Sequence, residues 1–524
     1  MSKTESEQST KNTAPRSLLR SSAVVGVMTM FSRVLGLIRD VVIAGYFGAG
    51  SSADAFFVAF KIPNFLRRLF AEGAFSQAFV PVLSEYRSQK DLQAVKALVD
   101  RVTGTLGLVL ILVTSLGVLG APVLAMIFAP GFYLNDSLRF ELVVDMLRFT
   151  FPYLFLISLT ALAGSVLNSY ERFAVPAFTP VLLNLSLIGA AIWLQPLFDQ
   201  PVMALAIGVL IAGSVQLFFQ LPFLWRINLL PRPRVDREHE GVRRIMLLML
   251  PALFGVSVSQ INLLLDTLLA SFLQTGSVSW LYYSDRLAEL PLGVFGIAIA
   301  TVILPSLSRK HAGQSGEAFA KTLDWAMRMV LLIGLPAALA LFVLAEPMIA
   351  TLFHYGQMQD RDVLMAGMSL RAYASGLLAF MLIKVLAPGY FSRQDIKTPV
   401  KIGIVAMVVN MALNLALIGP LAHVGLALAT SLSAFLNAGL LLRGLLRDGV
   451  FIWQPGWGKM LLRIVLANGA MVAFLVWLTG SSEIWLAYDL WQRVMQMAIL
   501  VCGGVAVYLV VLVLAGLRMK DLRH

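Results

Sequence analysis

The segment from Asp54 to Glu85 is apolar enough to cross a bilayer and yet carries several charges. Its first twenty residues contain Asp54, Lys61, Arg67, Arg68 and Glu72. On a helix, Asp54, Lys61 and Arg68 recur every seven residues and Glu72 follows Arg68 by four, so these four share one face. A charged side chain at the bilayer centre costs about 2.5 to 3.5 kcal/mol on insertion scales. The segment is therefore predicted to line a hydrated cavity or to pair its charges inside a helical bundle.

Composition identifies the chain as a polytopic membrane protein. Hydrophobic residues make up 58% of its 524 residues and charged residues 13%, against about 25% charged in an average soluble protein. Little chain is left for a separate catalytic domain. The net charge is +12, but the lysines and arginines lie mostly between apolar runs, so we interpret them as topology signals and expect no nucleic-acid partner. The single Cys502 excludes a disulfide framework and a cysteine-rich metal site.

Basic residues gather in every second connection between the apolar runs. Connections 48–52, 274–277 and 420–423 contain no lysine or arginine. Because loops rich in lysine and arginine stay on the cytoplasmic side, the alternation predicts that both termini are cytoplasmic and that the number of spans is even. Fourteen spans are predicted, near residues 20–47, 54–83, 102–128, 143–167, 176–195, 201–225, 245–273, 278–307, 325–349, 363–387, 399–419, 424–446, 460–480 and 490–517.

Short motifs repeat between the two halves of the chain at nearly one offset. FVPVLSE at 79–85 resembles ILPSLSR at 303–309, and Thr-Pro-Val occurs at 179–181 and again at 398–400. The repeat predicts an all-α fold of two six-helix lobes around a central hydrated cavity, related by an axis along the membrane normal and working by alternating access. The expected parts are a disordered cytoplasmic tail (1–17) without a cleaved signal peptide, an N-terminal lobe (18–227), a C-terminal lobe preceded by a basic cytoplasmic linker (228–447), and two further helices with a cytoplasmic C-terminus (448–524).

Further charges lie in the first and eighth predicted spans. The first span holds Arg33, Arg39 and Asp40, and the eighth holds Asp285, Arg286 and Glu289. Intramembrane charges are functional by default, and arginine pairs suit a diphosphate. The cluster therefore favours an anionic ligand over a cationic drug. The alternative is structural, with Arg33 bridging Asp40 and Arg68 bridging Glu72 inside the bundle.

Helix breakers interrupt the two most charged spans. Pro63 and Gly73 lie in the second span and Pro291 lies in the eighth. A proline removes a backbone hydrogen bond and kinks a helix, so these spans are predicted to be bent gating helices. The alternative is a static kink, which is common in membrane helices.

Four long motifs resemble the MurJ/MviN family. They are SRVLGLIRD at 32–40, DAFFVAFKIPNFLRRLFAEGAFSQAFVPVLSEY at 54–86, GSVSWLYYSDRLAELPLGVFGIAIATVILPSLS at 276–308 and APGYFSRQDIKTPVKI at 387–402. Members of that family are lipid II flippases of the multidrug/oligosaccharidyl-lipid/polysaccharide exporter superfamily. The resemblance implies that the cargo is the undecaprenyl-diphosphate-linked peptidoglycan precursor, moved to the outer leaflet of the bacterial inner membrane. It also implies membrane lipids and proteins of peptidoglycan synthesis as partners.

The resemblance also implies which residues serve transport. Family positions match Arg33, Arg39, Asp40, Asp54, Arg67, Arg68, Asp285 and Arg286, and the charge pattern adds Lys61, Glu72 and Glu289. The arginines are expected to bind the diphosphate, and the acids to hold the arginines when the site is empty. Export of an anion is favoured by about 2.3 kcal/mol per charge per 100 mV of membrane potential. No P-loop motif is present in the sequence and no cofactor is expected.

Three other functions are alternatives to a lipid II flippase. A cation-coupled multidrug antiporter of the same superfamily should have an acidic and aromatic site. A flippase for another polyprenyl-linked oligosaccharide would share the arginines, so only a substrate assay separates it. A membrane glycosyltransferase or phosphatase needs clustered acids or histidines and a metal, whereas the five histidines, at 239, 311, 354, 423 and 524, are scattered. We therefore expect a transporter and not an enzyme, with no metal site.

Overall fold

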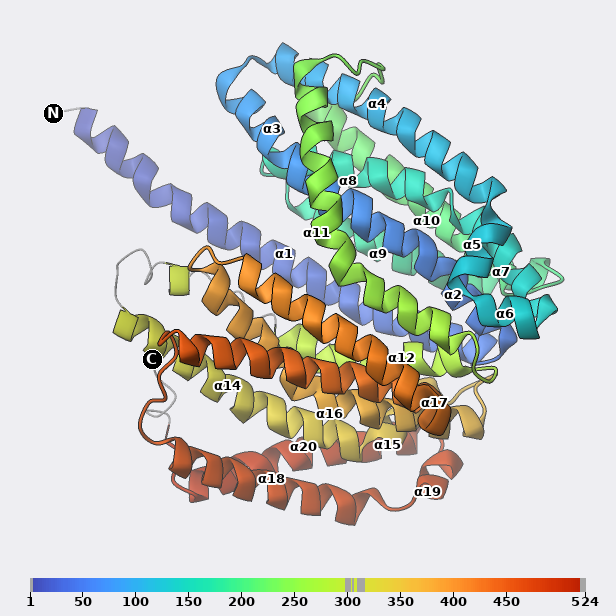
Figure 1. Cartoon of the computed structure of the whole chain (residues 1–524), viewed down its shortest axis with the longest axis vertical. Helices are drawn as coiled ribbons and strands as arrows, with labels where there is room; N and C mark the ends of the chain where they lie inside the picture. Colours follow the sequence, from blue (N-terminus) through green and yellow to red (C-terminus); the bar gives the residue numbers. More distant parts are fainter. Residues whose placement is uncertain (1–2, 297–302, 304–305, 309–315, 519–524) are drawn as a thin grey trace. The chain divides into compact units, whose positions relative to one another are not determined.

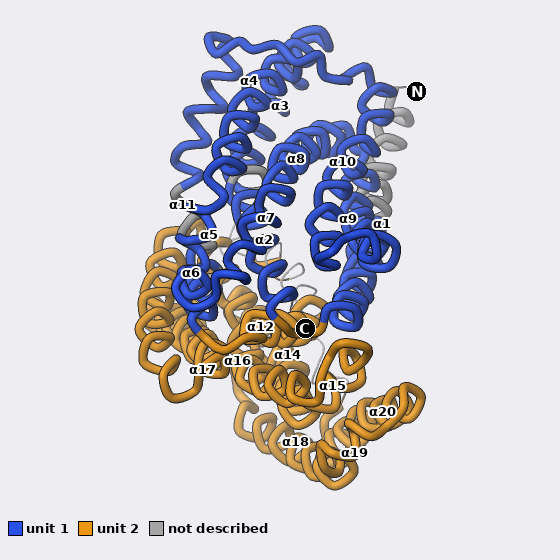
Figure 2. The backbone as a smooth tube through the Cα atoms, turned by 90° about the vertical axis from the view of Figure 1, so that its right-hand side faces the viewer, with its two compact units in different colours: residues 1–47, 51–272 blue, residues 48–50, 273–524 orange. Residues whose placement is uncertain are grey.

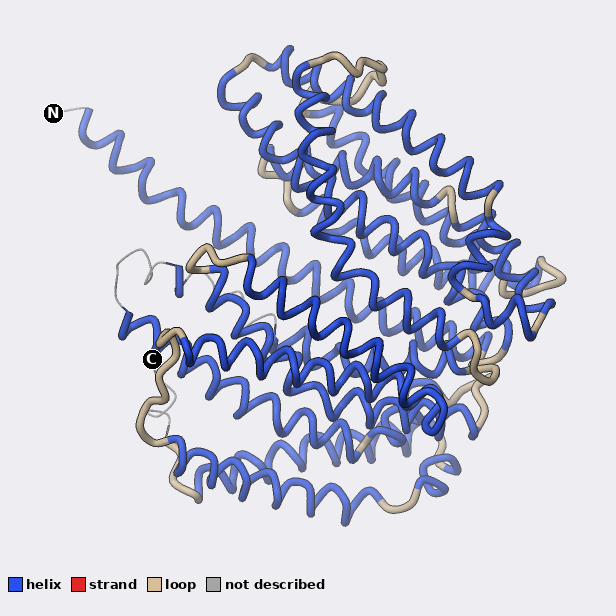
Figure 3. The backbone as a smooth tube through the Cα atoms, in the orientation of Figure 1, coloured by secondary structure: helices blue, strands red, loops and turns tan. Residues whose placement is uncertain are grey.

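The computed structural model describes residues 3–296, 303, 306–308 and 316–518, and its regular elements there are all helical (Figures 1 and 3). The chain forms two compact units (Figure 2). Residues 1–47 and 51–272 make unit 1, and residues 48–50 and 273–524 make unit 2. The predicted all-α fold is confirmed.

Unit 1 contains the helices up to α11. They are α1 (Lys3–Phe47), α2 (Ser51–Arg67), the π-helix η1 (Arg68–Phe75), α3 (Ser76–Gln89), α4 (Leu92–Leu119), α5 (Ala121–Phe128), α6 (Pro130–Asn135), α7 (Ser137–Thr150), α8 (Tyr153–Ser169), α9 (Ala174–Gly189), η2 (Ala190–Leu194), η3 (Gln195–Leu197), α10 (Met203–Arg226) and α11 (Glu240–Ala270). The first 17 residues, predicted to be disordered, are helical from Lys3 on. Extending an existing helix needs no new nucleus, so a polar sequence can continue one.

Unit 2 is arranged around the long helix α16. Its elements are α12 (Ser277–Pro291), the π-helix η4 (Leu292–Gly296), α14 (Gly316–Val343), α15 (Ala345–Phe353), α16 (Asp360–Phe391), α17 (Lys397–Arg447), α18 (Trp457–Thr479), α19 (Ser482–Ala487) and α20 (Leu490–Leu514). Helix α16 contacts α12, α14, α15 and α17. The Ser431 hydroxyl of α17 donates to the Ala372 carbonyl of α16 at 2.6 Å, beside Gly376. Small residues at such crossings let two membrane helices approach closely.

Nine helices in the described part of the chain are long and apolar enough to span a membrane. One of them, α17, is interrupted at Ala422, whose φ of 49° and ψ of −130° are not helical. That break falls within the predicted connection 420–423, so α17 holds two predicted spans. Four other predicted spans coincide with α1, with α2 to α3, with α11, and with α12 and η4. The last of these continues to 307 in the prediction, where residues 297–302 and 304–305 lie outside the described residues.

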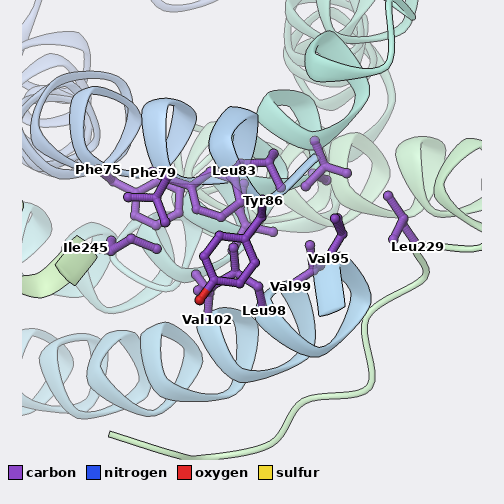
Figure 4. Close-up of a cluster of buried hydrophobic side chains, with 14 of the residues drawn as sticks. Phe75, Phe79, Leu83, Tyr86, Val95, Leu98, Val99, Val102, Leu229 and Ile245 are labelled. Atoms are coloured by element: carbon purple, nitrogen blue, oxygen red, sulfur yellow. The ribbon is translucent and has the colours of Figure 1, made fainter. Parts of the chain in front are cut away.

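The core of unit 1 joins α3, α4, α8 and α11. Figure 4 shows Phe75, Phe79, Leu83 and Tyr86 packed with residues of α4 and with Ile245 of α11. The rings of Phe75 and Phe79 stack with centroids 5.0 Å apart. Helix α11 contributes Val242 and Ile245 to this cluster and therefore belongs to unit 1. The predicted C-terminal lobe, residues 228–447, includes α11 instead, because apolar runs do not reveal which neighbour they pack against.

The linker between α10 and α11 is fastened to α4. The backbone N–H of Arg232 donates to the Asp100 carboxylate at 2.7 Å, and that of Arg234 donates to the Asp100 carbonyl at 3.0 Å. Arg101 forms an ion pair with Asp236 at 2.9 Å. Within this ion pair, the hydrogen bond from Arg101 Nε to the Asp236 carboxylate is the main cause that lowers the pKa of Asp236 below its usual value. The linker thus lies along α4 as an ordered strap.

Replacing Gly104 of α4 with alanine should destabilise unit 1 by about 1 to 3 kcal/mol, because the new methyl group would overlap the Arg234 backbone of the strap. Gly107 is the matched control, since a methyl group there meets nothing within 4 Å. Alanine at 107 should keep or raise the melting temperature, because alanine favours a helix over glycine by up to about 1 kcal/mol. The melting temperatures of wild type and the two variants would be compared on purified protein in detergent. Equal values for the two variants would show that the strap does not lie against position 104.

The hydrogen bond that Pro63 removes from α2 is replaced by a neighbouring helix. Pro63 has no N–H to bond the carbonyl of Ala59, four residues earlier. The Thr150 hydroxyl of α7 donates to that carbonyl at 3.1 Å. Buried backbone groups in a membrane must find such partners. The α-helix of the second predicted span changes at Arg68 to the π-helix η1, which contains the predicted breaker Gly73. The bend expected at Pro63 stays a prediction.

Candidate transport site

Arg39 and Asp40 form a buried pair that α9 holds in place. The exposed fractions of the two residues are 6% and 1%. Arg39 Nε and Nη2 lie 3.0 and 2.7 Å from Asp40 Oδ1, and Arg39 Nη1 donates to Asn184 Oδ1 at 3.0 Å. The amide of Asn184 also donates to the Ser32 carbonyl at 3.0 Å. Asn184 approaches α1 at Gly36, where an added Cβ would lie 3.7 Å from its Nδ2. One amide therefore fixes both the helix backbone and the guanidinium.

Arg33 lies on the same helix and is half-buried. Its side chain makes no hydrogen bond or ion pair with any residue that the structure describes. The predicted alternative of an Arg33–Asp40 bridge is therefore wrong. Asp40 pairs with its neighbour Arg39 instead. Arg33 is thus a half-buried cation of α1 with no counter-charge among the described residues.

Asp54 is fully buried and faces a cation that the sequence analysis did not select. Arg139 Nη1 of α7 lies 3.5 Å from Asp54 Oδ2, and Arg139 Nη2 lies 2.9 Å from Asp136 Oδ2. The guanidinium also lies 4.5 Å above the ring of Phe132. Burial raises the pKa of Asp136, but the hydrogen bonds from the Arg139 backbone and side chain outweigh burial and leave the pKa below its usual value. Arg139 thereby joins two carboxylates as a fixed cation.

The remaining charges of the second predicted span do not share one environment. Lys61 is half-buried in α2, and Arg67 donates through Nε to Asn64 Oδ1 at 3.2 Å. Arg68 is exposed and opens the π-helix η1, so α-helical spacing does not continue from Arg68 to Glu72. The predicted common face therefore ends at this point. The side chain of Glu72 lies outside the described residues.

The predicted site charges of unit 2 lie on one face of α12. Tyr282, Asp285, Arg286 and Glu289 follow the spacing of a single helix face. Arg286 Nη1 lies 3.4 Å from Glu289 Oε2, Nη2 lies 3.4 Å from the Tyr282 hydroxyl, and the guanidinium lies 5.1 Å from the centre of that ring.

The opposite face of α12 is anchored to α16. Trp280 Nε1 donates to Asp362 Oδ1 at 2.9 Å, and the Ser284 hydroxyl donates to the Ala366 carbonyl at 2.6 Å. Both anchoring residues are buried. The anchored face thus fixes the direction in which the charged face points.

A family model and the curated relatives of this chain agree on one family. A family model described as "Lipid II flippase MurJ" matches residues 43–509. A probable lipid II flippase MurJ of Vibrio cholerae is 52% identical over 98% of both chains. The corresponding protein of Haemophilus influenzae is 49% identical over 94% of this chain and 99% of its own.

Solved structures extend the comparison to the fold. A structure titled "Lipid II flippase MurJ, inward closed conformation" is 27% identical, covers 93% of this chain and 98% of its own, and has a TM-score of 0.78. An inward-facing multidrug transporter of the MATE family in the MOP superfamily covers 82% of this chain and 98% of its own, with a TM-score of 0.67 at 14% identity, which shows a shared fold. The chain belongs to the MurJ family of lipid II flippases.

Proposed function

We propose that this protein moves lipid II from the cytoplasmic to the periplasmic leaflet of the bacterial inner membrane by alternating access. The observation that carries the proposal is the placement of arginines in helices of both units that coincide with predicted spans, with Arg33 of α1 bound to no other described side chain. A diphosphate is recognised well by guanidinium groups, which form paired, charge-assisted hydrogen bonds. Family membership and the name of the relatives support the same cargo.

The candidate residues take different parts in this proposal. Arg33 and Arg286 bind the diphosphate, together with Arg67 and Arg68, while Lys61, Glu72 and Glu289 border the polar path of the headgroup. Asp40 holds Arg39 in place, as the 2.7 Å contact supports. Asp54 and Asp285 balance the cations when the cargo is absent. The membrane potential biases export by about 2.3 kcal/mol per charge per 100 mV. Both termini are cytoplasmic in this scheme, and proteins of peptidoglycan synthesis receive the cargo.

The test is transbilayer delivery of lipid II in cells depleted of their own flippase. Wild type should restore delivery, and Arg33→Ala and Arg286→Ala should each reduce it at least roughly tenfold, because a charge-assisted hydrogen bond contributes about 1.5 to 3 kcal/mol. Arg148→Ala in unit 1 and Lys321→Ala in unit 2 are the controls, since both side chains are more than half exposed. All variants would be compared at equal membrane abundance.

The outcomes separate the alternatives. Full delivery by both arginine variants would remove these residues from the site. If wild type itself failed to deliver lipid II, another polyprenyl-linked oligosaccharide or an antiporter substrate would have to be tested in its place.

A further inference from the structure

Unit 1 contains a cavity of about 370 Å³ that the transport site does not use. The cavity lies where the turn between α8 and α9 meets the end of α10, and Val24 of α1 closes one side. Figure 2 shows α1, α8, α9 and α10 near one another in unit 1, and α9 contacts the other three. We call this cavity the α8–α10 pocket.

The position of the α8–α10 pocket along the helices places it at a membrane boundary. One candidate span ends at Ser169, the next begins at Ala174, and a third ends at Arg226. The pocket therefore opens at the level where spans meet water, which is the level of phospholipid headgroups. Trp225, beside Arg226, is 68% exposed. Exposed tryptophans are typical of this interfacial layer.

Two arginines give the pocket its chemistry. Arg172 and Arg226 both line it, and neither side chain hydrogen bonds or forms an ion pair with a residue in the described part of the chain. The Arg226 guanidinium lies 5.6 Å from the centre of the Phe223 ring. Ala174 and Val175, the first residues of α9, also line the pocket. We propose that the α8–α10 pocket binds the phosphodiester headgroup of a membrane phospholipid.

Glu171 also lines the pocket, so its three charged side chains sum to +1. The pocket therefore favours a ligand with a single negative charge. A phosphodiester carries one negative charge and balances this sum, whereas free phosphate at neutral pH carries more charge and meets repulsion from the carboxylate. Phe173 and Phe223 supply the apolar wall against which the lipid glycerol and the first acyl carbons pack. The site is separate from the residues assigned to lipid II.

Lipid binding to the full-length protein in detergent tests the proposal. Phosphatidylglycerol would be titrated into wild type and into the double variant Arg172→Gln/Arg226→Gln, with bound lipid counted by native mass spectrometry. The pocket variant should lose roughly tenfold or more in affinity, as expected for two lost charge-assisted contacts. The matched control is Arg234→Gln/Arg237→Gln, which removes the same charge from exposed linker side chains of unit 1 that do not line the pocket. This control should bind lipid as wild type does.

Three results would overturn the proposal. Equal losses in the pocket and control variants would mean general charge attraction without a site. Unchanged binding by the pocket variant at an unchanged melting temperature would exclude the arginines. Displacement of the lipid by inorganic phosphate at concentrations similar to those of the lipid would assign the pocket to a soluble anion.

Discussion

Replacing Arg139 with alanine should destabilise unit 1 by about 3 to 5 kcal/mol, the cost typical of removing one member of a buried ion pair. The carboxylate of Asp54 is fully buried, and Arg139 lies 3.5 Å from it. Asp136 holds the same guanidinium at 2.9 Å, so the change takes a cation away from two carboxylates. The melting temperature of the purified protein in detergent should fall accordingly.

A double-mutant comparison separates the lost pair from general damage to α7. Asp54→Asn removes the buried charge, so the pair of changes Arg139→Ala and Asp54→Asn should cost less than the sum of the two single changes. Arg148→Ala, on the same helix, removes an exposed arginine paired with Asp145 and should stay within about 0.5 kcal/mol of wild type. Strictly additive losses would show that Arg139 and Asp54 do not interact.

Replacing Arg493 with alanine should destabilise unit 2 on the order of 3 kcal/mol, because buried carbonyl groups lose their donor. Arg493 is 4% exposed and lies near the start of α20. It donates to the carbonyls of Trp485 (3.1 Å), Leu486 (3.0 Å), Ala350 (3.1 Å) and His354 (2.8 Å). One guanidinium therefore joins α15, α19 and α20.

His354 contributes its imidazole ring to this cluster as well as its carbonyl. Its Nδ1 lies 2.8 Å from Arg493 Nη2, and its Nε2 lies 2.8 Å from Asp360 Oδ1. Burial, followed by the nearby Arg493 charge, lowers the pKa of His354. A neutral ring can accept from the arginine at Nδ1 and donate to Asp360 at Nε2.

The melting temperature of the Arg493→Ala protein should drop by roughly 6 to 12 °C. Arg493→Lys should also lose most of this stability, because a lysine has three donors on one nitrogen and cannot reach the same set of acceptors. Met495→Ala, an exposed position on the same helix, is the control and should cost little. A lysine variant as stable as wild type would mean that the charge alone, and not the planar set of donors, holds the cluster.

The spans and the breaks between them could be predicted from the sequence because they depend on local composition. The connection at 420–423 coincides with the non-helical Ala422, which interrupts α17. The need for another donor to the Ala59 carbonyl follows from the missing N–H of Pro63. The charged face of α12 follows from helical spacing alone, because Asp285, Arg286 and Glu289 lie within five residues of one another. The roles of these residues in transport stay a prediction.

Long-range pairs could not be predicted because the sequence does not show which distant residues meet. Arg139 lies 85 positions from Asp54, and in the sequence it reads as a basic residue of a connecting loop. Asn184 is one amide in an apolar span, 145 positions from the arginine that it binds. The sequence does mark Arg139 as unusual. It lies in one of the alternate connections between predicted spans, which contain almost no other lysine or arginine. An unusual charge in such a loop is a reason to look for a buried acid.

The π-helix η1 also has a consequence for the evolution of chain length in this family. A π-helical turn closes its hydrogen bonds over one residue more than an α-helical turn, so it accommodates an extra residue within a continuous helix. Loss of one residue between Arg68 and Phe75 would convert that stretch to α-helix while the faces of α2 and α3 keep their partners. Single-residue insertions and deletions among homologues should therefore be tolerated here, although elsewhere in a buried span one residue rotates every following side chain by about 100°.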